Sequence, residues 1–175
     1  MKRRELETAL RAAATLSGES EFFLLGSQAV HGSCRRPPAE VLLSQECDLY
    51  PKGSPLAGDV LATKLGRGSR FARAHGFYVD IVSPEIANLP TGWELRVQHL
   101  TVGPVTALCL EINDLVLSKL SAGRVKDFEF VSALVRRKLV RPATIRRRIR
   151  LLQDRLDQRQ VRFRFETVLN ELSRR

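Results

Sequence analysis

Hydrophobic residues recur with two different periods in the first part of the chain. Residues 3–17 place leucine and alanine at a spacing near 3.6 and are followed by Gly18, so we expect a helix that ends there. Residues 22–25 are wholly apolar and stop at Gly26, which is typical of a strand buried on both faces. The chain therefore begins with a helix and then a strand.

Short apolar or alternating runs, bounded by glycine, serine or proline, predict further strands. The last two are separated only by Gly103 and Pro104, which favours a hairpin. A helical pattern with an interruption at Gly66 and Gly68 lies between the earlier runs. The expected strands are residues 45–50, 77–82, 97–102 and 105–110, and the interrupted helix is residues 55–75.

From residue 112 onward the apolar spacing is helical almost throughout. We expect helices over 112–122 and 126–138, a third that opens at Pro142 and keeps an apolar stripe as far as Leu156, and a last one from about Arg162. The pattern predicts an α/β (α+β) body over residues 1–123, followed by a helical C-terminal part.

The charge of the chain changes where this C-terminal part begins. The 175 residues carry a net charge of +10, but residues 1–123 hold 13 basic and 13 acidic side chains, while residues 124–175 hold 16 basic and 6 acidic ones. A basic segment of this kind favours a partner that is a polyanion, such as RNA. The alternative is an arginine-rich helical face in contact only with solvent.

Cysteine, histidine and hydropathy exclude several classes of protein. The three cysteines and three histidines match no zinc-site spacing, and isolated thiols favour a reducing compartment. No apolar run approaches the roughly 20 residues that span a bilayer. We therefore expect a cytoplasmic protein with no membrane partner.

Three acidic side chains fall on predicted strands, where aspartate is depleted. Glu46 and Asp48 are two residues apart and so project from one face of their strand, and Asp80 lies on the next predicted strand. Such a cluster would repel itself without a cation, and oxygen ligands suit Mg²⁺. The alternative is that Glu46 and Asp48 cap a strand end while Asp80 pairs with an arginine.

A Gly-Ser pair follows the first strand. We expect Ser27 to be the N-cap of a helix over residues 28–31, so that free N–H groups, the Ser27 hydroxyl and the small Gly26 together offer a phosphate site. Gly-Ser before a helix is common, so this turn gains weight only in combination with the acidic cluster.

Together these elements resemble the nucleotidyltransferase superfamily that includes DNA polymerase β. The matching segments are Leu25-Gly26-Ser27, Glu46-Cys47-Asp48-Leu49 and Val79-Asp80-Ile81. Residues 113–127, from Asn113 to Asp127, resemble the "DL…SKL.AGR.KD" segment of bacterial nucleotidyltransferase-like proteins related to the abortive-infection toxins of the AbiEii kind. The resemblance covers residues 20–135 and implies a mixed β-sheet flanked by helices.

The resemblance also implies residue roles. Glu46, Asp48 and Asp80 would be the catalytic carboxylates and would hold Mg²⁺, with Asp80 orienting or deprotonating the attacking hydroxyl. Substrate-binding roles carry over to the turn and to basic residues near the end of the match, with Asp127 fixing their geometry or capping a helix. These substrate-binding residues are Gly26, Ser27, Lys119, Arg124 and Lys126.

Two features depart from the family pattern. Glu46 stands where the family usually has aspartate, and 18 residues separate Ser27 from Glu46, which is more than usual. The implied function is transfer of a nucleoside monophosphate from a nucleoside triphosphate to a hydroxyl of RNA (tRNA) or protein, with a toxin of a toxin–antitoxin or phage-defence pair as one role. The alternative is a catalytically degenerate module that binds nucleic acid or an antitoxin.

Overall fold

A five-stranded mixed sheet forms the centre of the first part of the chain. The structure is a computed structural model that describes residues 1–54 and 56–174. The strand order is β3-β2-β1-β5-β4, and the pairs β1–β5 and β2–β3 are parallel while β1–β2 and β4–β5 are antiparallel. The strands are β1 (Glu21–Leu24), β2 (Glu46–Pro51), β3 (Tyr78–Ile81), β4 (Gln98–Val102) and β5 (Val105–Cys109).

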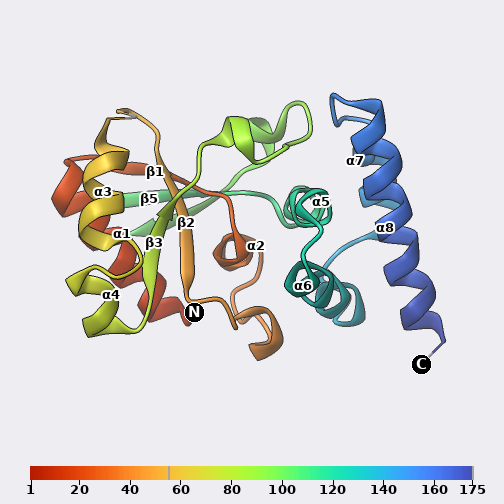
Figure 1. Ribbon diagram of the computed structural model, residues 1–175, viewed down its shortest axis with the longest axis horizontal. Coiled ribbons are helices and arrows are strands. Elements are labelled where there is room, and N and C mark those ends of the chain that lie inside the picture. Colours follow the sequence, from red (N-terminus) through yellow and green to blue (C-terminus); the bar gives the residue numbers. More distant parts are fainter. Residues whose placement is uncertain (55, 175) are drawn as a thin grey trace.

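Helices lie on both sides of this sheet (Figure 1). The α1, α3 and α4 helices lie on one side, where α1 packs against α3 and α3 against β2 and β3. The α5 to α8 helices form a bundle on the other side, with α5 in contact with α6, α7 and α8. The observed fold confirms the predicted α+β class and the flanked mixed sheet. The helices are α1 (Arg3–Ser17), α2 (Val30–Ser33), α3 (Ala57–Leu65), α4 (Arg70–His75), α5 (Ile112–Ala122), α6 (Val125–Arg136), α7 (Pro142–Ile149) and α8 (Arg155–Ser173).

Most of the predicted boundaries are confirmed, and their causes are local. The α1 helix ends at Gly18, whose φ of 74° is left-handed and costs glycine little. In β1, Phe22 and Leu24 are fully buried, whereas Phe23 is only partly buried and packs its ring 5.1 Å from that of Trp93. The expectation of a strand buried on both faces is therefore correct for only one face.

The helix boundaries near the C-terminus were predicted wrongly. The α7 helix ends at Ile149, so the apolar stripe does not run on to Leu156, which belongs to α8 and is exposed. The α8 helix begins at Arg155 because Asp154 caps it, its side chain accepting the backbone N–H groups of Leu156 and Asp157. The apolar residues keep a helical spacing across the turn between α7 and α8, so the pattern did not indicate this cap.

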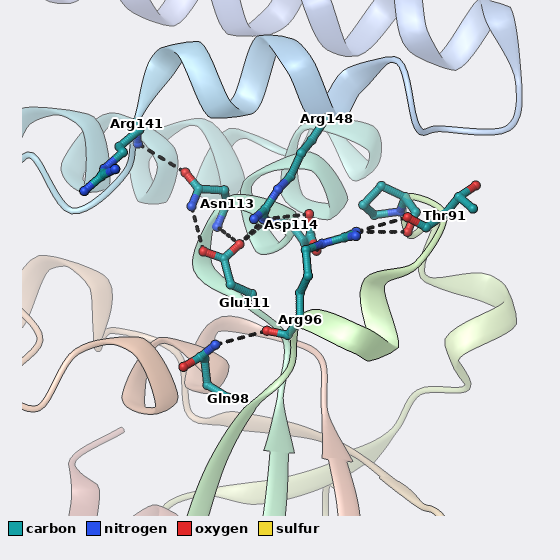
Figure 2. A network of polar contacts seen from close by, with 9 residues as sticks. Thr91, Arg96, Gln98, Glu111, Asn113, Asp114, Arg141 and Arg148 are labelled. Carbon is teal, nitrogen blue, oxygen red and sulfur yellow. Dashed lines mark hydrogen bonds and ion pairs between the residues drawn. The ribbon is translucent and has the colours of Figure 1, made fainter.

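A buried polar network joins α5 to α7 and to the loop before β4 (Figure 2). The Asp114 carboxylate is fully buried and accepts Arg96 Nε at 2.7 Å and Arg148 Nη1 at 3.0 Å. Arg148, whose side chain is only 14% exposed, also pairs with Glu111, the residue that caps the N-terminus of α5. Asn113 completes the connection, since its Oδ1 accepts the backbone N–H of Arg141 just before α7.

Candidate active site

Gly26 and Asp48 are in direct contact at the end of β1. A Cβ atom placed on Gly26 would come within 1.3 Å of Asp48 Oδ2, so the carboxylate occupies the space that any other residue's side chain would need. The close approach that Gly26 permits is therefore made to a carboxylate of the same chain. Antiparallel pairing of β1 with β2, which sets Leu24 opposite Leu49, brings the two residues together.

The structure corrects the expected helix after the Gly-Ser pair. Gly26 is the N-cap residue and Ser27 is the first residue of a 3₁₀ turn, Ser27–Ala29, with no side chain capping it. The α helix that follows is only the four residues Val30–Ser33, and the Ser27 side chain is buried. Ser27 is therefore not an N-cap, because the chain turns one residue earlier than the pattern indicated.

Asp48 and Asp80 are cross-strand neighbours. The parallel register of β2 and β3 pairs the two residues directly, so both carboxylates project from the same face of the sheet. Asp80 is exposed, whereas Asp48 is largely buried. Burial raises the pKa of Asp48 to about 6, and the nearby Glu46 and Asp80 add to this rise while Lys119 opposes it. The expected proximity of these two acids on adjacent strands is observed.

Glu46 contacts a lysine and a tyrosine. Lys126 Nζ donates to Glu46 Oε1 at 2.6 Å, and the Tyr78 hydroxyl donates to Glu46 Oε2 at 3.2 Å. Burial alone would raise the pKa of Glu46, but the bonds from Lys126 and Tyr78 outweigh it and lower that pKa. Lys126 thus meets the first of the three acids, a pairing that sequence reasoning did not predict.

Lys119 lies at the C-terminal end of α5, with its side chain only 7% exposed. Its ammonium lies 3.4 Å from Asp127 Oδ1 and 5.8 Å from the centre of the Phe130 ring. Arg124 Nε donates to the other oxygen of Asp127 at 2.8 Å, and Asp127 also accepts the backbone N–H of Arg124 at the start of α6. Asp127 therefore both orients the two cations and caps α6, the two roles expected for it.

One cavity collects most of the predicted site residues. Its volume is about 350 Å³, and its walls come from the turn after β1, from β2 and β3, from residues 82–88 after β3, from α5 and from the turn before α6. We call it the carboxylate cavity. Ser27 and Lys126 line a neighbouring cavity instead, and Glu46 lines both. The predicted residues in the carboxylate cavity are Gly26, Glu46, Asp48, Asp80, Lys119 and Arg124.

The donor set of this cavity suits Mg²⁺ only in part. Over residues 1–54 and 56–174, no three Asp, Glu, His or Cys side chains are grouped closely enough to hold a metal by themselves. Asp48 and Asp80 supply the one or two carboxylates with which proteins commonly bind Mg²⁺, the remaining ligands being water and substrate phosphates. Those two residues fit the ion, while Glu46 is bound to Lys126.

Comparison with known proteins identifies the family. A family model described as "Nucleotidyltransferase of unknown function (DUF6036)" matches residues 59–169. The chain belongs to this family of nucleotidyltransferases. The match includes Asp80 and the basic residues Lys119, Arg124 and Lys126, and it begins after Gly26 and the acidic pair. No curated protein and no solved structure matches the chain.

Sequence reasoning missed two further residues that contact the site. Tyr78 stands directly opposite Glu46 in the β2–β3 register and bonds to its carboxylate. Arg67 Nη2 donates to the Tyr78 hydroxyl at 2.6 Å from the turn between α3 and α4. Tyr78 was detectable as the residue two positions before Asp80 on the same strand face, whereas nothing in the pattern singled out Arg67.

The helices of the described residues carry no sign of a membrane span. Between residues 1 and 174, leaving out residue 55, none of them combines the length and the apolar character that crossing a bilayer requires.

Proposed function

We propose that this protein transfers a nucleoside monophosphate from a nucleoside triphosphate to a hydroxyl group, with Mg²⁺ as cofactor. The observation that carries the proposal is the Asp48–Asp80 pair, held over Gly26 in a cavity that Lys119 and Arg124 also line. Carboxylates and cations in one small cavity are what a triphosphate and its cation require. Membership of a nucleotidyltransferase family supports the same reaction.

In this proposal the basic residues bind phosphate, and the acidic residues bind the metal ion and activate the hydroxyl. Lys119 and Arg124 bind phosphate oxygens, and Asp127 keeps both cations in place without a bound anion. Asp80, as the exposed acid at the edge of the sheet, orients or deprotonates the attacking hydroxyl. Asp48 and Asp80 would hold Mg²⁺, which neutralises phosphate charge when it is bound. Lys126 and Ser27 contact the nucleotide from the neighbouring cavity.

For the acceptor we propose RNA, with tRNA as the first choice and a protein hydroxyl as the alternative. The support is the set of exposed arginines on α7 and α8, on the side of the molecule away from the sheet (Figure 1). Several of these, including Arg147, Arg155 and Arg159, are in no ion pair with any residue that the structure describes. Free guanidinium groups attract the phosphate backbone of a nucleic acid.

We also propose that the protein acts in the cytoplasm as the toxin of a toxin–antitoxin or phage-defence pair. The resemblance of residues 113–127 to the AbiEii kind supports this role, and a cognate antitoxin would be the partner. Induced expression in a bacterial host tests it: growth should stop with the wild type and continue with Asp80→Ala. Equal growth of the two strains at equal protein level would refute the toxin role.

One observation favours a second function. The Lys126–Glu46 ion pair, at 2.6 Å, occupies the acid that stands where relatives usually have aspartate. A site in which Glu46 is already paired with Lys126 suits a module that binds RNA or an antitoxin without catalysis. Under this alternative, substitution of Asp80 would leave the binding of RNA or of an antitoxin unchanged.

Incubation of the protein with each α-labelled nucleoside triphosphate, Mg²⁺, and either total RNA or cell protein tests the transfer reaction. We expect label to enter one acceptor with the wild type and not with Asp48→Ala or Asp80→Ala. Asp59→Ala is the matched control, because Asp59 is an exposed acid on α3 outside the cavity. Label transfer that survives both cavity substitutions, or none with the wild type, would contradict the proposal.

A further inference from the structure

The neighbour of the carboxylate cavity is the larger of the two. This second cavity has a volume of about 670 Å³, and it shares Glu46 with the carboxylate cavity. Its walls come from the 3₁₀ turn Ala39–Val41, the start of β2, the α3–α4 turn, α4, β3 and the start of α6. We call it the aromatic cavity, because Phe77, Tyr78 and Phe130 line it.

An arginine in contact with a tyrosine ring lies in this cavity. The Arg67 guanidinium carbon is 5.0 Å from the centre of the Tyr78 ring, and Arg67 Nη2 is fixed by its 2.6 Å bond to the Tyr78 hydroxyl. The hydroxyl is held in turn by Glu46. Arginine stacked on tyrosine, with further N–H groups free to donate, is a surface on which a planar heterocycle stacks well.

The two cavities differ in their side chains in a way that orients a bound nucleotide. Lys119 and Arg124 line the carboxylate cavity, and Asp48 and Asp80 there would hold a cation. The aromatic cavity has four carboxylates in its walls, those of Glu40, Glu46, Asp127 and Glu129, together with the cations Arg67 and Lys126 and its three aromatic side chains. The carboxylates of the aromatic cavity can accept hydrogen bonds from sugar hydroxyls and base amino groups, and its aromatic side chains offer a surface for a base. Because the phosphates need the cation that Asp48 and Asp80 would hold, a nucleotide would place its phosphates in the first cavity and its nucleoside beside the aromatic side chains of the second.

We propose that the aromatic cavity is the nucleoside site of this protein, with the base stacked on the Arg67–Tyr78 pair. This inference rests on the proposed nucleotidyl transfer, whose triphosphate would occupy the carboxylate cavity. The phosphate chain would pass Lys126, which stands with Glu46 on the boundary between the two cavities. Specificity for the base would then depend on residues of α4, β3 and α6 and not on Asp48 and Asp80.

A pair of substitutions on one helix tests the site. Ala72 of α4 lines the aromatic cavity, whereas Ala74, on the same helix, is exposed and outside it. Ala72→Phe fills the cavity and Ala74→Phe adds the same side chain to solvent. Calorimetric titration with each of the four ribonucleoside triphosphates, and with inorganic triphosphate, in Mg²⁺ buffer separates the nucleoside from the phosphate contribution.

We expect Ala72→Phe to raise the Kd of the preferred nucleotide at least about tenfold, with the Kd of inorganic triphosphate within about twofold of the wild type. Ala74→Phe should bind both ligands as the wild type does. Should Ala72→Phe fold poorly, Arg67→Ala provides the second test, since Arg67 is exposed. Loss of its stacking should weaken nucleotide binding about fivefold or more.

The outcomes separate this inference from the proposed function. Unchanged nucleotide Kd values for Ala72→Phe and Arg67→Ala, with wild-type binding and transfer intact, would overturn the nucleoside site and leave the proposed function standing. Unchanged nucleotide binding with a loss of transfer in Ala72→Phe would assign the cavity to the acceptor and also overturn the inference. A wild-type protein that binds no nucleoside triphosphate would end both proposals.

Discussion

The carboxylate of Asp48 occupies the position that a side chain at residue 26 would take, so Gly26 and Asp48 form one unit of the site. A methyl group at residue 26 must push the carboxylate away or move the end of β1. Of the two, Asp48 carries the charge that the proposed Mg²⁺ site requires. Glycine is therefore needed here for steric reasons, although its φ is an ordinary negative angle.

We expect Gly26→Ala to displace Asp48 and to lower nucleotidyl transfer by about 100-fold, since a misplacement of roughly 1 Å in a site has this effect. Gly53→Ala is the control. There the new Cβ would meet Glu19 Oε2 at 2.4 Å, but that atom ends a flexible side chain that can move aside. Initial rates of label transfer give the comparison, and equal rates for the two variants would show that Asp48 position does not matter.

The raised pKa of Asp48 predicts that stability of the metal-free protein falls as pH rises. Between the unfolded pKa of 3.8 and the folded pKa of about 6, the folded state retains a proton that the unfolded state has lost. One pKa unit corresponds to about 1.4 kcal/mol, so ionised Asp48 costs roughly 3 kcal/mol above pH 6. Asp48→Asn should remove this cost while abolishing transfer.

Urea unfolding without metal at pH 4.5 and pH 7.5 measures this effect. The wild type should lose stability on going to the higher pH, relative to Asp48→Asn, and the variant should be the more stable protein at pH 7.5. Asp59→Asn, which neutralises an exposed carboxylate, should follow the wild type. Parallel pH profiles for wild type and Asp48→Asn would show that the carboxylate is not destabilising.

Two neighbouring arginines on α7 should contribute very different amounts to the stability of the fold. Arg148→Ala leaves the fully buried Asp114 with one cation fewer and removes the bond to Glu111, so we expect a loss of about 2–4 kcal/mol. Arg147→Ala removes an exposed side chain and should change the free energy of unfolding by less than about 0.5 kcal/mol. Denaturant titration measures the free energy of unfolding of both variants. Similar losses for the two would show that the contacts of Arg148 with Asp114 and Glu111 do not stabilise the fold.

The distinction between exposed and buried or paired arginines also predicts which of them contact RNA. Arg147, Arg150, Arg155 and Arg159 are exposed. Their joint replacement by glutamine should weaken binding of a tRNA pool and reduce the slope of log Kd against log salt by roughly three. Arg146→Gln alone, which removes a residue paired with Glu166 at 2.8 Å, should change the slope little. An unchanged slope in the fourfold variant would make this face a solvent-exposed surface only.

Sequence periodicity was sufficient for most of the fold because each element has a strong local signal. Gly18 ends α1, the run before Gly26 forms β1, and Glu46 and Asp48 alternate with buried residues in β2. The acid on the next strand then reached Asp48 through ordinary parallel pairing. These features depend on neighbours in sequence or on a single strand register, both of which a pattern can indicate.

Contacts between distant elements could not be predicted in the same way. Lys126 is 80 residues from Glu46, and their ion pair depends on how α6 packs beside β2. Arg148 looked like one of several equivalent arginines, yet only its position on α7 faces Asp114. A count of charges along the chain does not distinguish Arg148 from the other arginines of α7. Its burial depends on how α7 packs against α5.

The position of β3 at the edge of the sheet has a consequence for the size of the acceptor. Because β3 is an edge strand of the sheet in the part of the chain that the structure describes, the exposed Asp80 can be approached from the side while the proposed nucleotide would lie in the two cavities. A macromolecule could present a single hydroxyl to Asp80 at the carboxylate cavity while the rest of it stays outside. The walls of the two cavities would then govern the choice of nucleotide, and the open edge of the sheet would leave the acceptor to be chosen by contacts elsewhere on the surface.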